Sequence, residues 1–141
     1  MKKVFAFDMG KASIGYCVRE DFEIKEVSKD FLGTMWSNSG FADTKKDTII
    51  SYTLKNPYTY KVDFPYEKKS MDSLFNSEHL SKKDKYAYYL DGNHSITKIT
   101  SSVANDKKLA IIKDSYAHSI APFLANHFKE IHLIDLRYYN D

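Results

Sequence analysis

The segment from residue 107 to 139 limits the possible folds more than any other part of the sequence. "KKLAIIKD" is an apolar run of the length of one buried strand, and "AHSIAPFLANHF" has the spacing of a helix. "EIHLIDLRYY" then predicts a further strand. Two strands joined by a helix form a βαβ unit, which has parallel strands and a right-handed crossover. Pro122 must lie in the first turn of the helix or bend it. The pattern predicts an α/β fold.

Most patterns upstream of this unit predict strands. The first three strands would form a β-meander, which is the simplest assembly of consecutive strands joined by turns. After them, Trp36 and Phe41 should anchor an irregular segment, because Gly, Ser and Asn surround them. Pro65 ends the last strand or confines it to a sheet edge. The predicted upstream strands are residues 3–7, 13–19, 22–27, 47–54 and 58–64.

The chain becomes more regular after residue 76. Residues 77–90 have the pattern of a helix, with Ser77 or Ser81 as its N-cap. "DGNHS" at residues 91–95 predicts a turn, and the alternation over residues 96–100 predicts a short strand that leads toward the βαβ unit.

The composition excludes several classes of protein. A chain of 141 residues can bury one substantial core, which fits a single domain. Its 21 basic and 19 acidic residues are interspersed, so the sequence lacks the basic stripe of a nucleic-acid-binding protein. The lone Cys17 excludes an internal disulfide and a Cys-rich zinc site. With 11 Tyr and 9 Phe, the chain could have an aromatic core or a Tyr-rich binding surface.

The N-terminus predicts a cytoplasmic protein. Two lysines precede an apolar run, as in a secretory signal, but the run ends at Asp8 and is too short for a signal core. The sequence also has no apolar stretch long enough to span a membrane.

Ser115 stands where the first strand of the βαβ unit meets the helix. In parallel sheets, functional groups gather beyond the carboxyl ends of the strands. Amides at the start of the helix could stabilise the oxyanion that forms when a serine attacks an ester. The same position suits a helix cap, because Ser115 and Asp114 are both preferred capping residue types. The residues alone leave both interpretations open, a nucleophile and a cap.

Three blocks of the sequence resemble the DHHW family, which is similar to the SGNH hydrolases. The resemblance covers about residues 28–140 and implies a serine esterase or O-acyl transferase fold acting on O-acylated carbohydrate, with Ser115 at the nucleophile position. The third block is the most specific because it matches in order and without gaps. The blocks are "VSKDFLGTMWSNSGF", "KKDKYAYYLDGNHSITKI" and "KKLAIIKDSYAHSIAPFLANHFKEIHLIDLRYYN".

The sequence lacks the motif that is thought to supply the catalytic acid and base in this family. The Asp-His-His-Trp motif that names the family is absent, and the family continues beyond "DLRYYN". A serine is a weak nucleophile without a base to accept its proton. His118, three residues after the serine, and His94, in the predicted turn, are the candidate replacements. With Asp114 and Asn93 as binding residues, we expect a partial domain that is catalytically incomplete.

The N-terminal residues 2–27 resemble a different family. "VFAFDMGKASIGYCV" resembles the first RuvC motif of type II CRISPR effector nucleases, an RNase H-like hairpin. The resemblance implies that Asp8 would hold a catalytic Mg²⁺, but such chemistry needs several convergent carboxylates, and the later motifs that supply them are absent. The matching residues are Asp8, Gly10, Ser13, Gly15 and Tyr16.

Together these patterns predict one compact α/β domain over residues 1–141. A RuvC-like β-hairpin at 1–27 would join a partial SGNH-like sheet at 28–141. If this domain is active, we expect a serine-dependent ester hydrolase or acyl transferase that needs no cofactor, and the sequence shows no strong signal for nucleic-acid or membrane binding. The alternatives are a Mg²⁺-dependent nuclease element centred on Asp8 and a non-catalytic binding module that uses the tyrosines.

Overall fold

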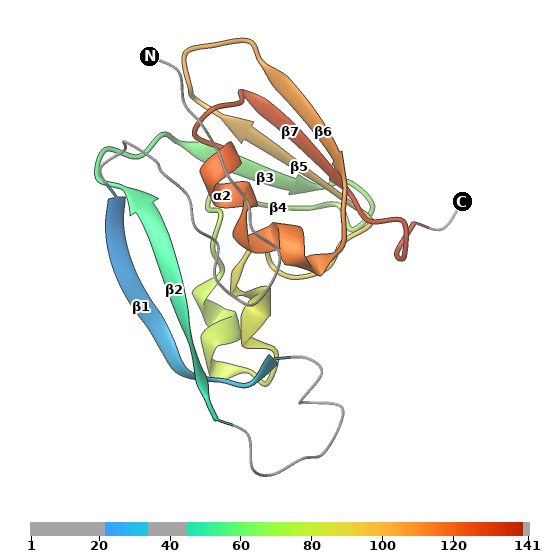
Figure 1. Cartoon of the computed structure of the whole chain (residues 1–141). Coiled ribbons are helices and arrows are strands. Elements are labelled where there is room, and N and C mark those ends of the chain that lie inside the picture. The colour runs from blue at the N-terminus through green and yellow to red at the C-terminus, as the bar shows by residue number, and fades with distance from the viewer. Residues whose placement is uncertain (1–21, 34–44, 140–141) are drawn as a thin grey trace.

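The computed structural model describes residues 22–33 and 45–139, which form two β-sheets and several short helical turns (Figure 1). The features expected elsewhere lie outside these ranges and stay predictions. They are the strands at 3–7 and 13–19, Asp8, Cys17, and the anchors Trp36 and Phe41.

The smaller sheet consists of two antiparallel strands (Figure 1). β1 (Phe22–Phe31), which was expected to end at Val27, pairs with β2 (Asp47–Leu54), whose bounds match the prediction. The register shifts on both sides of Ser28, so the strand is bulged there. A β-bulge inserts an extra residue, which interrupts the alternation of apolar and polar residues. The strand pairing continues beyond the bulge, although the alternation predicted an end at Val27.

The larger sheet has the strand order β4-β3-β5-β7-β6. Neighbouring strands are antiparallel except for β6 and β7, which are parallel. The strand β4 was not predicted, because three residues are too few to show an alternation. The strands are β3 (Tyr60–Phe64), β4 (Lys69–Met71), β5 (Ile96–Ser101), β6 (Lys108–Ile112) and β7 (Glu130–Ile134).

The parallel βαβ unit predicted at the end of the chain is confirmed, with a shorter crossover. Ile112 of β6 lies opposite Ile134 of β7. The helix expected over residues 117–128 is divided into the 3₁₀ turn η3 (Ser115–Ser119) and the single α-turn α2 (Ala121–Leu124). Pro122 lies in the first turn of α2, where its missing N–H removes no hydrogen bond.

The helix predicted over residues 77–90 is wrong. The chain forms two 3₁₀ turns instead, η1 (Ser77–Ser81) and η2 (Lys85–Tyr88), and then pairs with an extended segment. Leu90 donates its amide hydrogen to the carbonyl of Leu74 at 3.1 Å, which would be impossible within a continuous helix. This tertiary pairing overrides the local helix propensity. In the described ranges no helical segment has the length and apolar content needed to cross a membrane.

The main core lies between the larger sheet and the crossover. Alternate residues of the central strands point toward α2 and are fully buried, which is the burial pattern of a sheet covered on one face. The buried cluster comprises Val62, Phe64, Leu74, Leu90, Ile99, Ala121, Ala125, Ile131 and Leu133.

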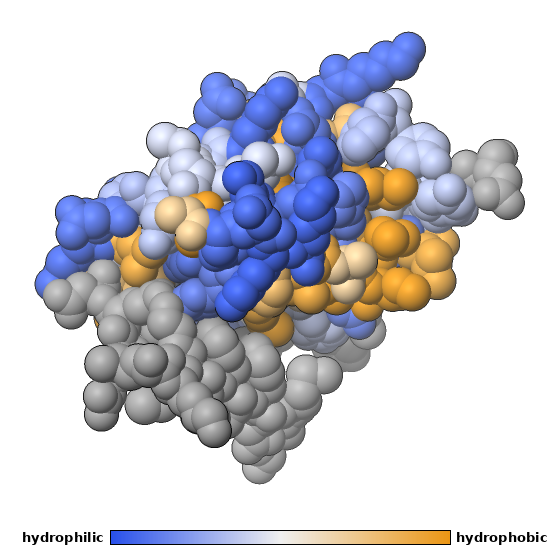
Figure 2. Space-filling view, turned by 90° about the horizontal axis from the view of Figure 1, so that it is seen from above, coloured by the Kyte–Doolittle hydropathy of each residue, from blue (hydrophilic) through white to orange (hydrophobic). Residues whose placement is uncertain are grey.

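The opposite face of this sheet is open and carries both charged and apolar side chains. Glu130 forms ion pairs there with Lys98 at 3.0 Å and Lys108 at 3.1 Å, and its Oε1 lies 3.2 Å from His132 Nε2. Seen from above, hydrophilic side chains occupy the middle of the molecule, and hydrophobic ones gather on the right (Figure 2). Ile112 and Leu136 are among the exposed large apolar side chains, at 72% and 62%. The sheet therefore has one covered face and one mixed, open face.

Candidate functional site

The sequence-predicted site residues meet at one edge of the larger sheet. This edge carries the carboxyl ends of the parallel strands β6 and β7 and the beginning of the antiparallel β5. Two backbone hydrogen bonds join the segments that follow, from the Lys113 amide to Ile134 and from the Asp135 amide to Ser95, each at 2.9 Å. The topology therefore places the predicted serine and both predicted histidines on the same side of the fold.

Ser115 begins η3 directly beyond β6, and its side chain is partly exposed. Asp114 is the N-cap, and its carboxylate accepts a hydrogen bond from the amide of Tyr116 at 3.0 Å. Asp114 is therefore the capping residue, and Ser115 does not cap the turn. Within residues 22–33 and 45–139, the Ser115 hydroxyl makes no hydrogen bond.

The backbone amides beyond Ser115 are partly engaged. The Tyr116 amide donates to the Asp114 carboxylate, and the Ala117 amide lies 3.4 Å from the Asp114 carbonyl. An oxyanion at the serine would have to compete with these acceptors. The helix amides proposed as oxyanion donors from the sequence are thus not all free in this arrangement.

His118 belongs to a buried polar cluster rather than to a pair with the serine. Its Nε2 accepts a hydrogen bond from the Lys113 ammonium at 2.6 Å, and its side chain is 1% exposed. Lys113 also donates to Asp135 Oδ2 at 3.3 Å. Asp135 in turn accepts two side-chain hydrogen bonds from Arg137, at 2.7 and 2.9 Å. We call Lys113, His118, Asp135 and Arg137 the charged cluster.

The electrostatics of the charged cluster keep His118 neutral. Burial, reinforced by the positive charge of Lys113, lowers the pKa of His118 to about 4. Burial also lowers the pKa of Lys113, whereas the hydrogen bonds from Arg137 lower the pKa of Asp135. The lone pair of His118 Nε2 accepts the hydrogen bond from Lys113. This nitrogen therefore cannot accept the Ser115 proton while that bond is made.

His94 has part of the geometry of a catalytic histidine. Its Nδ1 lies 2.8 Å from Glu67 Oε1, and its ring stacks on Phe64 with centroids 3.9 Å apart. A carboxylate at Nδ1 orients an imidazole and leaves Nε2 as the base, as in a Ser-His-Asp triad. Here Nε2 is buried and has no hydrogen-bond partner in the described part of the chain, with Asp91 Oδ2 at 3.8 Å. His94 is therefore oriented but is not bonded to Ser115.

Asp91 fixes the turn that carries His94. It accepts hydrogen bonds from Lys69, Asn76 and His79, each between 2.6 and 2.9 Å. Although burial opposes ionisation, these three hydrogen bonds lower the pKa of Asp91 to about 2. Gly92 has φ of +94°, a conformation that side-chain-bearing residues rarely adopt.

Asn93 lies at the exposed end of the same turn. Its amide donates to the hydroxyl of Tyr138 at 3.3 Å, so it links the turn to the segment after β7. This places Asn93 on the same edge as Ser115, where it would face a bound molecule from the opposite side of β7. Its role as a binding residue stays a prediction.

Asp8, the predicted metal ligand, lies outside the described residues. Among the residues that are described, no group of three or more His, Cys, Asp or Glu side chains is arranged to hold a metal ion.

Sequence reasoning missed Glu67, Lys113, Asp135 and Arg137. Lys113 and Asp135 each directly follow one of two parallel strands whose last residues, Ile112 and Ile134, are paired. Opposite charges directly after two buried parallel strands could have predicted this ion pair from the sequence. The contact between Glu67 and His94 had no sequence signal, because the two residues are 27 positions apart.

Comparison with known proteins gives matches in structure only. No family model matches the sequence, and no curated protein matches it. A DHHW family protein from Eubacterium siraeum is similar, with a TM-score of 0.65 and 26% identity over 85% of this chain and 41% of that one. PatB1 from Bacillus cereus is also similar, with a TM-score of 0.64 and 21% identity over 94% of this chain and 46% of that one. The structure of PatB1 with a sulfonyl adduct has a TM-score of 0.63 and 22% identity over 84% of this chain and 40% of that one.

The chain thus has the α/β fold of DHHW family and PatB1 structures, of which it spans between two fifths and a half of the length. The identities with PatB1 establish the fold alone. None of the three matches supports the RuvC resemblance of residues 2–27.

Proposed function

We propose that this chain is a DHHW-type, SGNH-like domain for ester hydrolysis or O-acyl transfer in which Ser115 is the nucleophile. One observation carries the proposal. The Ser115 hydroxyl lies beyond the carboxyl end of β6 and is free of hydrogen bonds within the described residues, on a fold shared with a DHHW family protein. This is the edge at which α/β sheets bind their ligands.

The chemistry would proceed through an acyl-enzyme. The Ser115 oxygen attacks the carbonyl carbon of an ester, the carbon–oxygen bond to the leaving alcohol breaks, and the serine proton passes through a base to that alcohol. Water or an acceptor hydroxyl then attacks the acyl group and releases the serine. Hydrolysis and acyl transfer therefore differ only in the second acceptor.

The missing component is the base. In the described part of the chain, none of the five histidines is hydrogen-bonded to Ser115, and His118 Nε2 is occupied by Lys113. His94 is the remaining candidate, because Glu67 orients its ring and its Nε2 is free. We therefore propose that the chain as it stands forms an acyl-enzyme slowly and turns over very weakly or not at all.

An O-acylated carbohydrate is the proposed substrate class. The support is the resemblance of residues 28–140 to the DHHW family, together with the fold shared with a DHHW family structure. A neutral sugar ester would meet both polar and apolar groups at this edge, including Asn93 and the exposed ring of Tyr116.

Active-site labelling tests the nucleophile. A fluorophosphonate or a sulfonyl fluoride should label the chain on one residue, and peptide mass spectrometry should place the adduct on Ser115. The probe is apt because PatB1 has been solved with a sulfonyl adduct. Ser115→Ala should abolish the labelling. Ser119→Ala is the matched control, because Ser119 lies in the same turn and donates to the Tyr116 carbonyl. Labelling that persists in Ser115→Ala would refute the proposal.

A further inference from the structure

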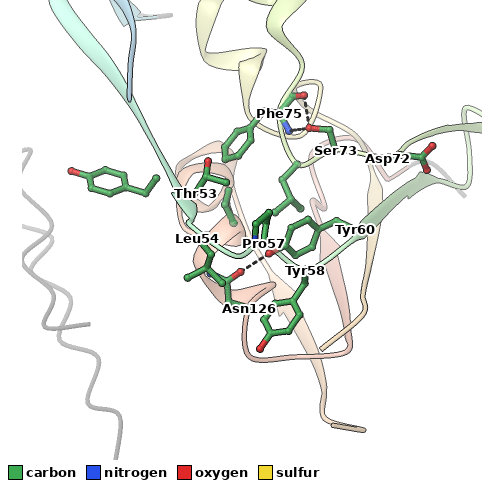
Figure 3. A pocket seen from close by; sticks show the side chains of 12 residues that line it. Thr53, Leu54, Pro57, Tyr58, Tyr60, Asp72, Ser73, Phe75 and Asn126 are labelled. Carbon is green, nitrogen blue, oxygen red and sulfur yellow. Dashed lines mark hydrogen bonds between the residues drawn. The ribbon is translucent and has the colours of Figure 1, made fainter. Parts of the chain in front are cut away.

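A pocket opens at the sheet edge opposite to Ser115. It lies between β2 of the smaller sheet, the start of β3, and the crossover at α2 (Figure 3). Tyr60 at the start of β3 pairs with Ser101 at the end of β5, whereas the Ser115 edge carries the beginning of β5. The pocket is therefore separate from the proposed acyl-transfer site and could be occupied independently of it.

Flat rings form much of the pocket wall. Tyr58 lies just before β3, Tyr60 is the first residue of β3, and Phe75 comes from the segment after β4 (Figure 3). Phe75 is held in place by stacking on Tyr88, with centroids 5.0 Å apart. Tyr58 is 38% exposed, so its ring is accessible to a ligand. Such rings offer apolar faces at low cost in side-chain entropy.

Asn126 supplies a preorganised polar group. It is 7% exposed, and its Oδ1 accepts a hydrogen bond from the Tyr60 hydroxyl at 2.6 Å (Figure 3). The oxygen is thereby fixed, and the Asn126 amide nitrogen donates to no residue of the described chain. This nitrogen is accessible from the pocket, because it is not among the described buried atoms that lack a partner, so a ligand acceptor could bind it in place of water.

The charge of the lining limits the class of ligand. Asp72 is the one charged side chain among the described residues that line the pocket, and it is exposed at the rim. Because the described lining contains this carboxylate and no lysine or arginine, it disfavours an anionic ligand. A wholly apolar ligand would cover the Asn126 amide nitrogen without offering it an acceptor, which also opposes binding. A neutral ring that carries hydroxyl groups satisfies both conditions.

The pocket volume of about 170 Å³ sets the size of the ligand. A cavity of about 150 Å³ is large enough to hold one six-membered ring. We propose that this pocket binds a single neutral sugar ring, whose C–H face stacks on Tyr58 and whose hydroxyl groups bond to Asn126 and Asp72. The proposal goes beyond the acyl-transfer function, because the ring would be held at the opposite edge of the sheet.

An NMR titration of the full chain tests the proposal. Methyl α-glucopyranoside, N-acetylglucosamine and maltose are the probes, and phenol is the comparison for purely aromatic binding. We expect dissociation constants in the millimolar range and amide shifts confined to the segments around Tyr58, Asp72 and Asn126. Ser115→Ala should bind the same sugar with the same affinity, so failure of the acyl-transfer proposal would not affect this result.

Two variants make the test specific. Asn126→Asp keeps the acceptor for the Tyr60 hydroxyl but removes the amide donor, and Tyr58→Ala removes the stacking ring; each should weaken binding about tenfold. Tyr66→Ala is the control, because Tyr66 is 53% exposed and follows the opposite end of β3. The proposal is overturned if no sugar shifts these resonances, if phenol alone does so, or if both variants bind as tightly as the wild type.

Discussion

Replacing Asp135 by Asn should destabilise the protein strongly, because it removes the negative charge at the centre of the charged cluster. The Asp135 side chain is fully buried, and Lys113, its partner at 3.3 Å, is 1% exposed. Arg137 is 52% exposed and can turn toward water, so its share of the loss is small. Breaking a buried ion pair costs about 3–5 kcal/mol, and we expect about 3 kcal/mol for Asp135→Asn because the amide still accepts one hydrogen bond.

Urea denaturation followed by circular dichroism measures this loss. With a slope of about 2 kcal/mol per molar urea, a loss of about 3 kcal/mol lowers the unfolding midpoint by about 1.5 M. Asp106→Asn is the matched control, because Asp106 pairs with Lys129 at 3.2 Å but is 95% exposed. That change should cost less than about 0.5 kcal/mol.

A second variant distinguishes a buried charge from a simple packing defect. Adding Lys113→Met to Asp135→Asn removes the ammonium that would otherwise be buried without a counter-charge, so the double variant should be more stable than Asp135→Asn alone. If Asp135→Asn unfolds at the wild-type midpoint, or if the double variant is no more stable than the single one, the charged cluster does not have the energetic role described here.

Two further predictions concern the same edge of the sheet. Because burial lowers the pKa of His118 from 6.5 to about 4, the unfolded chain binds a proton more readily, and stability should fall by about 3 kcal/mol as the pH decreases from about 6.5 to about 4. Urea midpoints across this range should show the fall in the wild type but much less in His118→Gln; equal slopes would contradict it. Gly92→Ala should cost about 1–2 kcal/mol, because φ is +94° and the new Cβ would lie 3.2 Å from that of Ala87. A thermal midpoint equal to that of the wild type would rule this out.

The sequence predicted the position of the site better than its contacts. Buried apolar runs on either side of a helical pattern were sufficient to place β6 and β7 in parallel, because few other arrangements bury such strands. The carboxyl ends of those strands then placed Ser115 at this edge of the sheet. These conclusions depend only on local periodicity and on the geometry of parallel sheets.

The contacts that decide the chemistry depend on tertiary structure. Lys113 follows the apolar run of β6 directly in the sequence, and it is buried because it lies between His118 and Asp135. The helix expected over residues 77–90 failed for a similar reason, since Leu90 pairs with Leu74 through the backbone. Propensity scales describe a residue by its neighbours in sequence, and neither interaction is visible there.

The rate of Ser115 labelling as a function of pH tests the central claim most directly. The claim is that Ser115 is a nucleophile at the sheet edge and that, within the described residues, no histidine is hydrogen-bonded to its hydroxyl to take the proton. A fluorophosphonate should therefore label Ser115 at a rate that keeps rising with hydroxide concentration up to about pH 10. A rate that levels off above about pH 7, the signature of an imidazole base, would contradict the account.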